Sequence, residues 1–311
     1  MSRRLRFILA LACLYLMTYG SAAAASTSIW VALSETGGAH AEAAEALRAS
    51  VEQAQPGRFE WRVAHWSQFG SVLPEPQWVI AVGTAAHRGM QERFAADTTP
   101  PPLLAILVPR LAFERIAEPA RLRGGSLSAV FLDQPPARQL ELIRLALPAV
   151  RNVGILVGGE SKTHGPGLEK AAKKRGMQLA TSLVGQDGLF AALQSLLAEV
   201  EVLLALPDPT VFNSQTAANI LTAAYRRHVP LVGFSPAYAK AGALLALYST
   251  PSQVGVRGAE LLRQALAGKS LPPPQGAREF VVTINRDVAR SLGLALDEAQ
   301  LMEQLRQRDR P

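Results

Sequence analysis

The sequence predicts an α/β protein made of two doubly wound lobes, each a parallel sheet covered by helices. Short apolar segments alternate with amphipathic ones, which is the pattern of strand, crossover helix and strand. The apolar segments lack polar alternation, as expected where helices cover both faces of a sheet. The alternation restarts after residue 133. With 311 residues, 49% of them hydrophobic, the chain is long enough for two cores.

The first 25 residues have the pattern of a signal peptide and are excluded from the fold. A basic start precedes an apolar segment at 7–19 and small residues at 21–25. The apolar segment is shorter than the roughly 20 residues that cross a bilayer, and an uncleaved anchor is the alternative. Cys13 lacks the leucine three positions earlier that a lipoprotein signal requires. We therefore predict a periplasmic protein and disfavour a lipid anchor.

Charge and cysteine content narrow the function classes. The formal net charge of +7 falls to +4 when Arg3, Arg4 and Arg6 leave with the signal peptide. The densest basic segment, 170–175, has no interleaved aromatic residues and fits the solvated face of a helix, so no nucleic-acid partner is predicted. Cys13 is the only cysteine, so the mature chain has no disulfide and no thiol chemistry.

The first lobe is predicted to span residues 26–132. Continuous apolar segments indicate its strands, except the one at 59–66, which polar–apolar alternation indicates, and 3.6-residue periodicity indicates its helices. In chain order we expect a strand at 29–33, a helix at 39–53, strands at 59–66 and 78–82, a helix at 84–94, and strands at 103–108 and 127–132.

The second lobe is predicted to span residues 133–249, by the same two patterns. We expect strands at 153–157, 179–184, 202–206, 230–234 and 243–248, and helices at 136–147, 165–175, 189–200 and 214–228.

The C-terminal third does not form a third lobe, because one helix, one linker and one strand cannot bury their apolar faces alone. We assign about 250–272, with the helix at 253–267, to the first lobe. We assign about 273–300, with the strand at 279–284 and a short helix capped by Asn285, to the second lobe. The chain then crosses between lobes more than once, which predicts a hinge. Residues 301–311 are polar and are expected to form a frayed tail.

Catalytic and cofactor motifs are weak. No G-x-G-x-x-G fingerprint occurs, and Gly268-Lys269-Ser270 ends a helix where a phosphate loop would open one, so no cofactor is predicted. Ser235 resembles the nucleophile of an α/β hydrolase, but Pro236 has no N–H for an oxyanion hole.

Metal binding is a second alternative. It would use three histidines that each follow a strand, and three neutral imidazoles can ligate zinc or copper. The three are His40, His87 and His164. Histidines exposed on loops explain the same pattern without a metal.

A doubly wound sheet places ligands beyond the carboxyl ends of its strands, where helix N-termini present free N–H groups. Polar residues at these ends are therefore the candidate ligand contacts. In the first lobe they are Ser34, Glu35, Gly83, Thr84 and Arg110; in the second they are Ser161, Asp208, Asn213 and Ser235, and Ser249 lies at a crossover.

Two of these candidates carry charge. Arg110 suits a carboxylate, because a guanidinium is always charged and binds in a bidentate manner. Asp208, or alternatively Glu160, suits an amine. Each residue also fits the simpler role of a helix cap or turn former, as in the Asp208-Pro209 turn.

The order of several segments resembles the ABC-transporter substrate-binding family typified by the tryptophan/tyrosine-binding lipoproteins. Residues 132–156 are similar to the start of that family's second lobe. Later segments are similar at 206–212, 240–244, 259–272 and 282–293, so the resemblance covers about 125–295. It implies a type I periplasmic-binding-protein fold and a small solute delivered to a membrane permease. The loops at 34–38 and 108–113 depart from the family pattern, so the resemblance does not carry over an aromatic amino acid as ligand.

The sequence therefore predicts a monomeric, non-enzymatic solute-binding component of an ABC-type uptake system. Its lobes are expected to close by hinge motion on a small polar or amphiphilic solute, such as an amino acid or a related compound. A membrane permease, or instead a sensor, would recognise the closed form. An exported sensor or partner-binding protein of the same fold is the main alternative, ahead of a hydrolase that uses Ser235.

Overall fold

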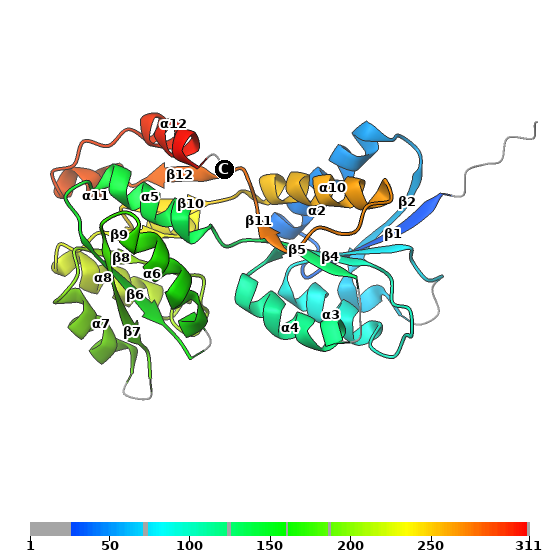
Figure 1. The fold of residues 1–311 in the computed structure, drawn as a ribbon, viewed down its shortest axis with the longest axis horizontal. Helices are drawn as coiled ribbons and strands as arrows, with labels where there is room; N and C mark the ends of the chain where they lie inside the picture. The colour runs from blue at the N-terminus through cyan, green and yellow to red at the C-terminus, as the bar shows by residue number, and fades with distance from the viewer. Residues whose placement is uncertain (1–25, 71–73, 123–125, 160, 186–187, 310–311) are drawn as a thin grey trace, which may run out of the picture.

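The chain folds into two lobes, each built on a six-stranded sheet with helices on both faces (Figure 1). This computed structural model describes residues 26–309 except 71–73, 123–125, 160 and 186–187. The signal segment expected at 1–25, including Cys13, lies outside the described residues. Within the described part, no helix is long and apolar enough to cross a bilayer.

The first sheet has the strand order β11-β5-β4-β3-β1-β2, and all its pairings are parallel. Successive residues of β1 point to opposite faces, because side chains alternate along a strand. Ile29, Val31 and Leu33 pack with helices α2 and α10. Trp30 and Ala32 pack with α3 and α4 on the other face. This burial on both faces explains why the strand is apolar throughout.

The elements of the first lobe have the following bounds. The strands are β1 (Thr27–Leu33), β2 (Phe59–His65), β3 (Trp78–Val82), β4 (Leu103–Val108), β5 (Leu127–Phe131) and β11 (Gln275–Gly276), and a short 3-10 helix, η1, covers Trp66–Gln68. The α-helices are α2 (Gly38–Ala54), α3 (Thr84–Arg93), α4 (Arg110–Leu122) and α10 (Pro251–Leu266).

The second sheet has the order β12-β10-β9-β8-β6-β7. Its strands are parallel except β12, which pairs antiparallel with β10 at the edge. Helices α5, α6 and α12 share one buried core with this sheet, and α7, α8 and α9 share the other.

The elements of the second lobe have the following bounds. The strands are β6 (Asn152–Val157), β7 (Gln178–Leu183), β8 (Val202–Leu204), β9 (Leu231–Gly233), β10 (Leu245–Tyr248) and β12 (Val281–Ile284). The helices are α5 (Pro136–Ala146), η2 (Ser161–His164), α6 (Gly165–Lys173), α7 (Leu189–Leu197), α8 (Ala217–Arg226), α9 (Pro236–Ala241), α11 (Arg286–Ser291) and α12 (Glu298–Arg308).

The described chain passes between the two sheets three times. Residues 132–135 join β5 to α5, residues 249–250 join β10 to α10, and residues 277–280 join β11 to β12. The second crossing is fixed by a capping box, in which Thr250 accepts from the Gln253 N–H while the Gln253 side chain accepts from Thr250.

The expectation of a frayed C-terminal tail is wrong. Residues Glu298–Arg308 form helix α12, which begins at Asp297, whose carboxylate accepts from the Gln300 N–H. Leu301 and Leu305 are buried against the second core. One turn separates these two leucines, so they lie on the same face of the helix and both pack on the core. The other boundary also differs slightly, since β11 places residues 275–276 in the first sheet.

Candidate functional site

A cavity of about 180 Å³ lies where the two lobes meet. Its walls come from the start of α4, from the first crossing and from segments of the second lobe. The lining residues are Arg110, Asp133, Gln134, Pro136, Gln139, Thr163, Gly167, Leu168, Leu206 and Pro207. These segments follow the carboxyl ends of strands or open helices, which is the ligand position expected of doubly wound sheets.

Arg110 is the residue of the first lobe that reaches this cavity. Its backbone N–H donates to the Asp133 carboxylate over 2.7 Å. Its guanidinium carbon lies 4.9 Å from the centre of the Phe131 ring, within cation–π range. The contacts to Asp133 and Phe131 tie the start of α4 to the end of β5 and to the first crossing.

An irregularity in β4 precedes Arg110. Leu107 has a φ of 54°, in the left-handed region that a branched side chain rarely adopts. The pairing of β4 with β5 shifts register between Ile106 and Val108 at the same point. Bulges of this kind redirect the chain beside functional sites. Here the irregular residue, Leu107, lies three positions before Arg110, the first residue of α4.

Asp208 follows β8 and is 4% exposed. Its carboxylate accepts from the backbone N–H groups of Gly158 and Thr210, each over 2.9 Å, and from the Thr210 hydroxyl over 2.6 Å. Burial raises the pKa of Asp208, but hydrogen bonds from Ser161, Thr210 and Gly158 outweigh it, so the pKa is lowered. A carboxylate has about four acceptor positions. Asp208 therefore holds two loops of its own lobe together and leaves little capacity for an amine.

Two neighbours complete this arrangement. Ser161 is fully buried, and its Oγ accepts from the Gly158 N–H over 2.9 Å. A Cβ at Gly158 would collide with Thr210 and Asp208. The Gly158–Ser161 loop and Asp208 thus form one polar cluster beside the cavity. Glu160, the alternative partner for an amine, lies outside the described residues.

The remaining first-lobe candidates cluster at the ends of β1 and β3, which are adjacent strands. Ser34 Oγ accepts from the Ala86 N–H over 2.9 Å and so supports the first turn of α3, which Thr84 begins. Gly83 has a φ of 91°, and a Cβ there would collide with Ser34 and His40. Because these groups serve one tight turn and do not line the cavity, their direct role in binding is a prediction that the geometry leaves open.

Glu35 belongs to the same turn. Its side chain is 79% exposed and lies 3.9 Å from His40 Nδ1.

Asn213 and Ser235 also lie at helix starts. The Asn213 side chain accepts from the N–H groups of Gln215 and Thr216 and donates to the carbonyl of Pro209. It therefore organises the segment before α8. Ser235 is the N-cap residue of α9 and Pro236 is its first residue.

Ser249 lies in the hinge. Its hydroxyl donates to the Glu279 carbonyl over 2.7 Å and accepts from Gln134 Nε2 over 2.9 Å. Gln134 belongs to the first crossing, Ser249 to the second and Glu279 to the third. One serine thus connects all three passages of the chain.

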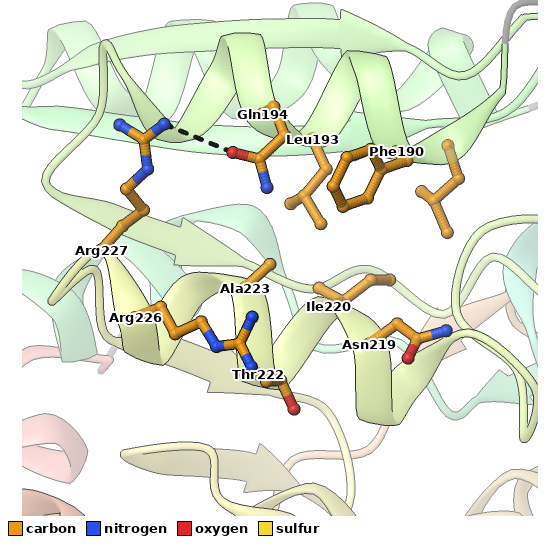
Figure 2. Close-up of a pocket in the computed structure, with 10 residues that line it drawn as sticks. Phe190, Leu193, Gln194, Asn219, Ile220, Thr222, Ala223, Arg226 and Arg227 are labelled. Carbon is orange, nitrogen blue, oxygen red and sulfur yellow. Dashed lines mark hydrogen bonds between the residues drawn. The ribbon is translucent and has the colours of Figure 1, made fainter.

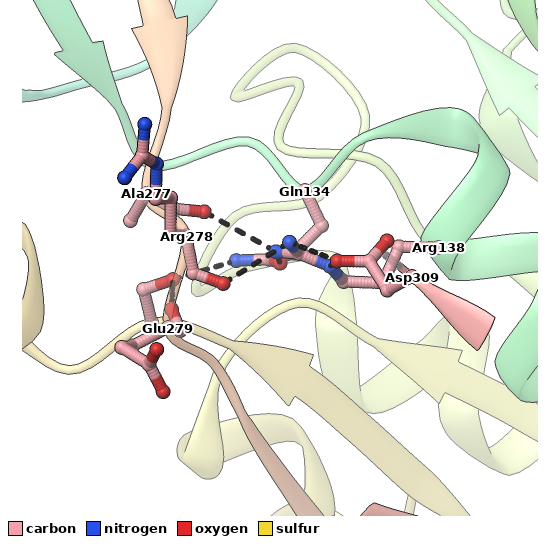
Figure 3. Close-up of polar contacts among 7 residues, drawn as sticks. Gln134, Arg138, Ala277, Arg278, Glu279 and Asp309 are labelled. Atoms are coloured by element: carbon pink, nitrogen blue, oxygen red, sulfur yellow. Dashed lines mark hydrogen bonds and ion pairs between the residues drawn. The ribbon is translucent and has the colours of Figure 1, made fainter. Parts of the chain in front are cut away.

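Arg138 extends this network, and sequence analysis missed it. Its guanidinium donates to Gln134 Oε1 over 2.8 Å and to the carbonyls of Ala277 and Arg278 over 3.2 and 3.1 Å. It also pairs with Asp309 at the end of α12, with Nε to Oδ2 at 2.8 Å (Figure 3). A charged residue at the start of the first crossover helix was the available sequence signal, but its partners are far apart in the chain.

Among the described residues, no group of three or more His, Cys, Asp or Glu side chains could hold a metal ion. The side chain of His164, the third histidine of the metal alternative, lies outside the described residues. His87 is fully buried and its ring stacks on Phe113 with centroids 5.0 Å apart. His40 lies in the turn beside Gly83.

Comparisons with known proteins agree with this architecture. The family model described as ABC transporter substrate binding protein matches residues 124–306, which is more than half of the chain. A comparison with curated protein sequences finds no match.

Solved structures share the fold at low sequence identity. A ligand-free, open substrate-binding protein with adhesive properties from Clostridium difficile has a TM-score of 0.65 at 15% identity, over 89% of this chain and 97% of that one. An ABC domain in complex with L-Trp from Streptococcus pneumonia has a TM-score of 0.60 at 17% identity, with the same coverage. A periplasmic ribose ABC transporter structure from Conexibacter woesei has a TM-score of 0.52 at 14% identity, over 91% and 99% of the chains.

These matches show the type I periplasmic-binding-protein fold that the sequence predicted. Residues 124–306 include most of the second lobe, the second crossing with α10, and the third crossing. The chain belongs to the ABC transporter substrate-binding protein family.

Proposed function

We propose that this protein is the periplasmic solute-binding component of an ABC-type uptake system and that it binds a small polar or amphiphilic solute between its lobes. The observation that carries the proposal is the cavity lined by Arg110 from one lobe and by Gln139, Thr163 and Leu206 from the other. A solute held there touches both lobes, so its binding favours the conformation in which they are close.

Arg110 supplies the main polar contact in this proposal. Its position in the wall of the cavity and its fixed charge suit a carboxylate, which a guanidinium binds through two parallel hydrogen bonds. Gln139 and Thr163 add neutral hydrogen-bonding groups, and Leu168 and Leu206 add apolar surface. This combination fits an amino acid or a related carboxylic acid.

The size of the cavity supports a small solute. Pockets for drug-sized ligands measure roughly 300–1,000 Å³, whereas this cavity measures about 180 Å³. We propose that residues 26–132 with 250–276 move as one body against 133–249 with 277–309. The three crossings at Gln134, Ser249 and Glu279 would act as the hinge. The protein works as a monomer and passes its solute to a membrane permease; no chemical step is part of the proposal.

A thermal-shift screen tests this function. The mature protein is heated with single L-amino acids, other small carboxylic acids and neutral sugars. A solute at 100 times its Kd stabilises the folded state by about 2.7 kcal/mol, so we expect a saturable rise in Tm with at least one carboxylate. Tryptophan fluorescence is a poorer readout, because the four tryptophans all lie in the first lobe and none lines the cavity.

The matched variants are Arg110→Gln and Arg290→Gln. Arg290 is an arginine on α11 whose side chain is 79% exposed, far from the cavity lining. The first variant should lose the response to the carboxylate, and the second should keep it. An unchanged response in Arg110→Gln would refute the role of Arg110, and a screen without any saturable shift would refute solute binding.

A further inference from the structure

A second, larger hollow lies in the second lobe, between helices α7 and α8 (Figure 2). It has a volume of about 780 Å³ and shares no lining residue with the cavity that contains Arg110. We refer to it as the α7–α8 groove, lined by Leu189, Phe190, Leu193, Gln194, Asn219, Ile220, Thr222, Ala223, Arg226 and Arg227.

One part of the groove is apolar. Leu193 of α7 and Ile220 of α8 are buried, at 2% and 0% exposure, and face each other across it (Figure 2). Ala223 is small and leaves space between the helices. The Phe190 ring is 70% exposed at the edge. A large aromatic ring in water beside an open apolar recess is the kind of surface that marks a binding site.

The other part of the groove is cationic. Helix α7 has no charged residue, and Arg226 is the only charged residue of α8, with Arg227 directly after it. Among the described residues, no carboxylate pairs with Arg226. Arg227 donates to Gln194 Oε1 over a long 3.4 Å (Figure 2). The C-terminus of α8 favours cations here, but the guanidinium groups keep hydrogen-bond donors for an anion.

We propose that the α7–α8 groove binds an amphiphilic anion, with its apolar body against Phe190, Leu193 and Ile220 and its anionic head against Arg226 and Arg227. The volume is within the range of small-molecule sites, roughly 300–1,000 Å³. A recess suits a single molecule, whereas docking on an anionic bilayer typically uses clusters of four to eight cations. The site is separate from the interlobe cavity and does not depend on solute transport.

The test uses the fluorescent dansylamino derivative of undecanoate and its methyl ester, which has the same body without the charge. For the mature protein we expect saturable one-to-one binding of the acid, with the ester about tenfold weaker. The double variant Arg226→Gln/Arg227→Gln should bind the acid about tenfold more weakly and the ester unchanged. Arg226→Lys/Arg227→Lys should restore part of the preference for the acid, and Phe190→Ser should weaken both ligands.

Controls separate this site from other surfaces. Arg290→Gln removes an exposed arginine elsewhere in the second lobe, and Arg110→Gln removes the cation of the interlobe cavity. Both should bind the acid as the unmodified protein does, so failure here and failure of solute transport are distinguishable. All variants are first compared by circular dichroism and Tm.

Four outcomes would overturn the proposal. Equal binding of the acid and the ester to the unmodified protein would remove the role of charge. Full affinity in the double glutamine variant would remove the role of Arg226 and Arg227. Loss of binding in Arg110→Gln alone would place the probe between the lobes. Sedimentation with phosphatidylglycerol vesicles, without binding of the monomeric acid, would identify the surface as a membrane contact instead.

Discussion

Removing Arg138 should destabilise the protein more than any exposed arginine does. Its side chain is 6% exposed and contacts the first crossing through Gln134 and the third through Ala277 and Arg278, as well as Asp309. The guanidinium carbon also lies 4.4 Å from the centre of the Phe280 ring. Substitution by methionine keeps most of the volume but leaves one carboxylate, one amide oxygen and two carbonyls without their donor.

The magnitude follows from burial. Breaking a buried ion pair by removing one partner costs about 3–5 kcal/mol. Asp309 is 23% exposed and can be rehydrated, so we expect Arg138→Met to lower the free energy of unfolding by about 3 kcal/mol. The measurement is urea unfolding followed by circular dichroism. The curve is first inspected for two transitions, because the two lobes can unfold separately.

The matched control is Arg144→Gln on the same helix. Arg144 is 40% exposed, and its partner Glu141 keeps ion pairs with Arg175 and Arg308 when Arg144 is removed. We therefore expect a cost of about 0–1 kcal/mol, as for an exposed pair. If Arg138→Met costs no more than Arg144→Gln, the network does not hold the crossings together, and the assignment of Arg138 to the hinge is wrong.

Three further predictions concern single positions. Asp208→Asn should lower the free energy of unfolding by about 1–3 kcal/mol at pH 7, because an amide nitrogen cannot accept the hydrogen bonds. The folded-state pKa of Asp208 is lowered from 3.8, so this stability is present above the unfolded value and is lost as the pH falls through the folded one. The gap between Asp208→Asn and the unmodified protein should therefore narrow in acid. Gly83→Ala should lower the free energy of unfolding more than Gly176→Ala does. Both glycines have positive φ, but only at Gly83 do side chains occupy the position of the added Cβ. Leu305→Ala should cost about 2–4 kcal/mol, because the side chain is fully buried.

Urea unfolding curves of each variant and of the unmodified protein test these three predictions. A gap for Asp208→Asn that is constant from pH 7 to pH 3 would mean that its carboxylate does not stabilise the loop. Equal losses of unfolding free energy in the two glycine variants would mean that the turn at Gly83 tolerates a side chain. No effect of Leu305→Ala would restore the frayed tail that the sequence suggested.

The strands were predictable because their burial leaves a local signature. Residues such as Ile29 and Trp30 are both buried although they face opposite sides of the sheet, so the whole segment is apolar. Helix α12 has no such signature, since Leu301 and Leu305 are its only buried residues. Its position depends on contacts with α5, more than 150 residues earlier in the chain.

The site was predictable only in outline. Strand ends are local features, so Arg110 and Asp208 could be named from the sequence. Which of them faces the cavity depends on how the lobes meet, and the sequence does not contain that geometry in any local pattern. Asp208 is occupied by its own lobe, while Gln139 and Thr163 line the cavity without having been predicted. The hinge contacts of Arg138 join residues 139 to 171 positions apart, beyond the range of any periodicity.

Energy transfer between one dye on each lobe tests the central claim most directly. The mature chain has no cysteine if the signal segment is removed, so Glu45→Cys and Lys173→Cys, at side chains 61% and 72% exposed, can be labelled specifically. The carboxylate selected by the thermal-shift screen should change the transfer efficiency saturably in this protein and leave it unchanged when Arg110→Gln is added. A carboxylate that binds without changing the distance between the dyes would contradict closure of the lobes around a shared solute.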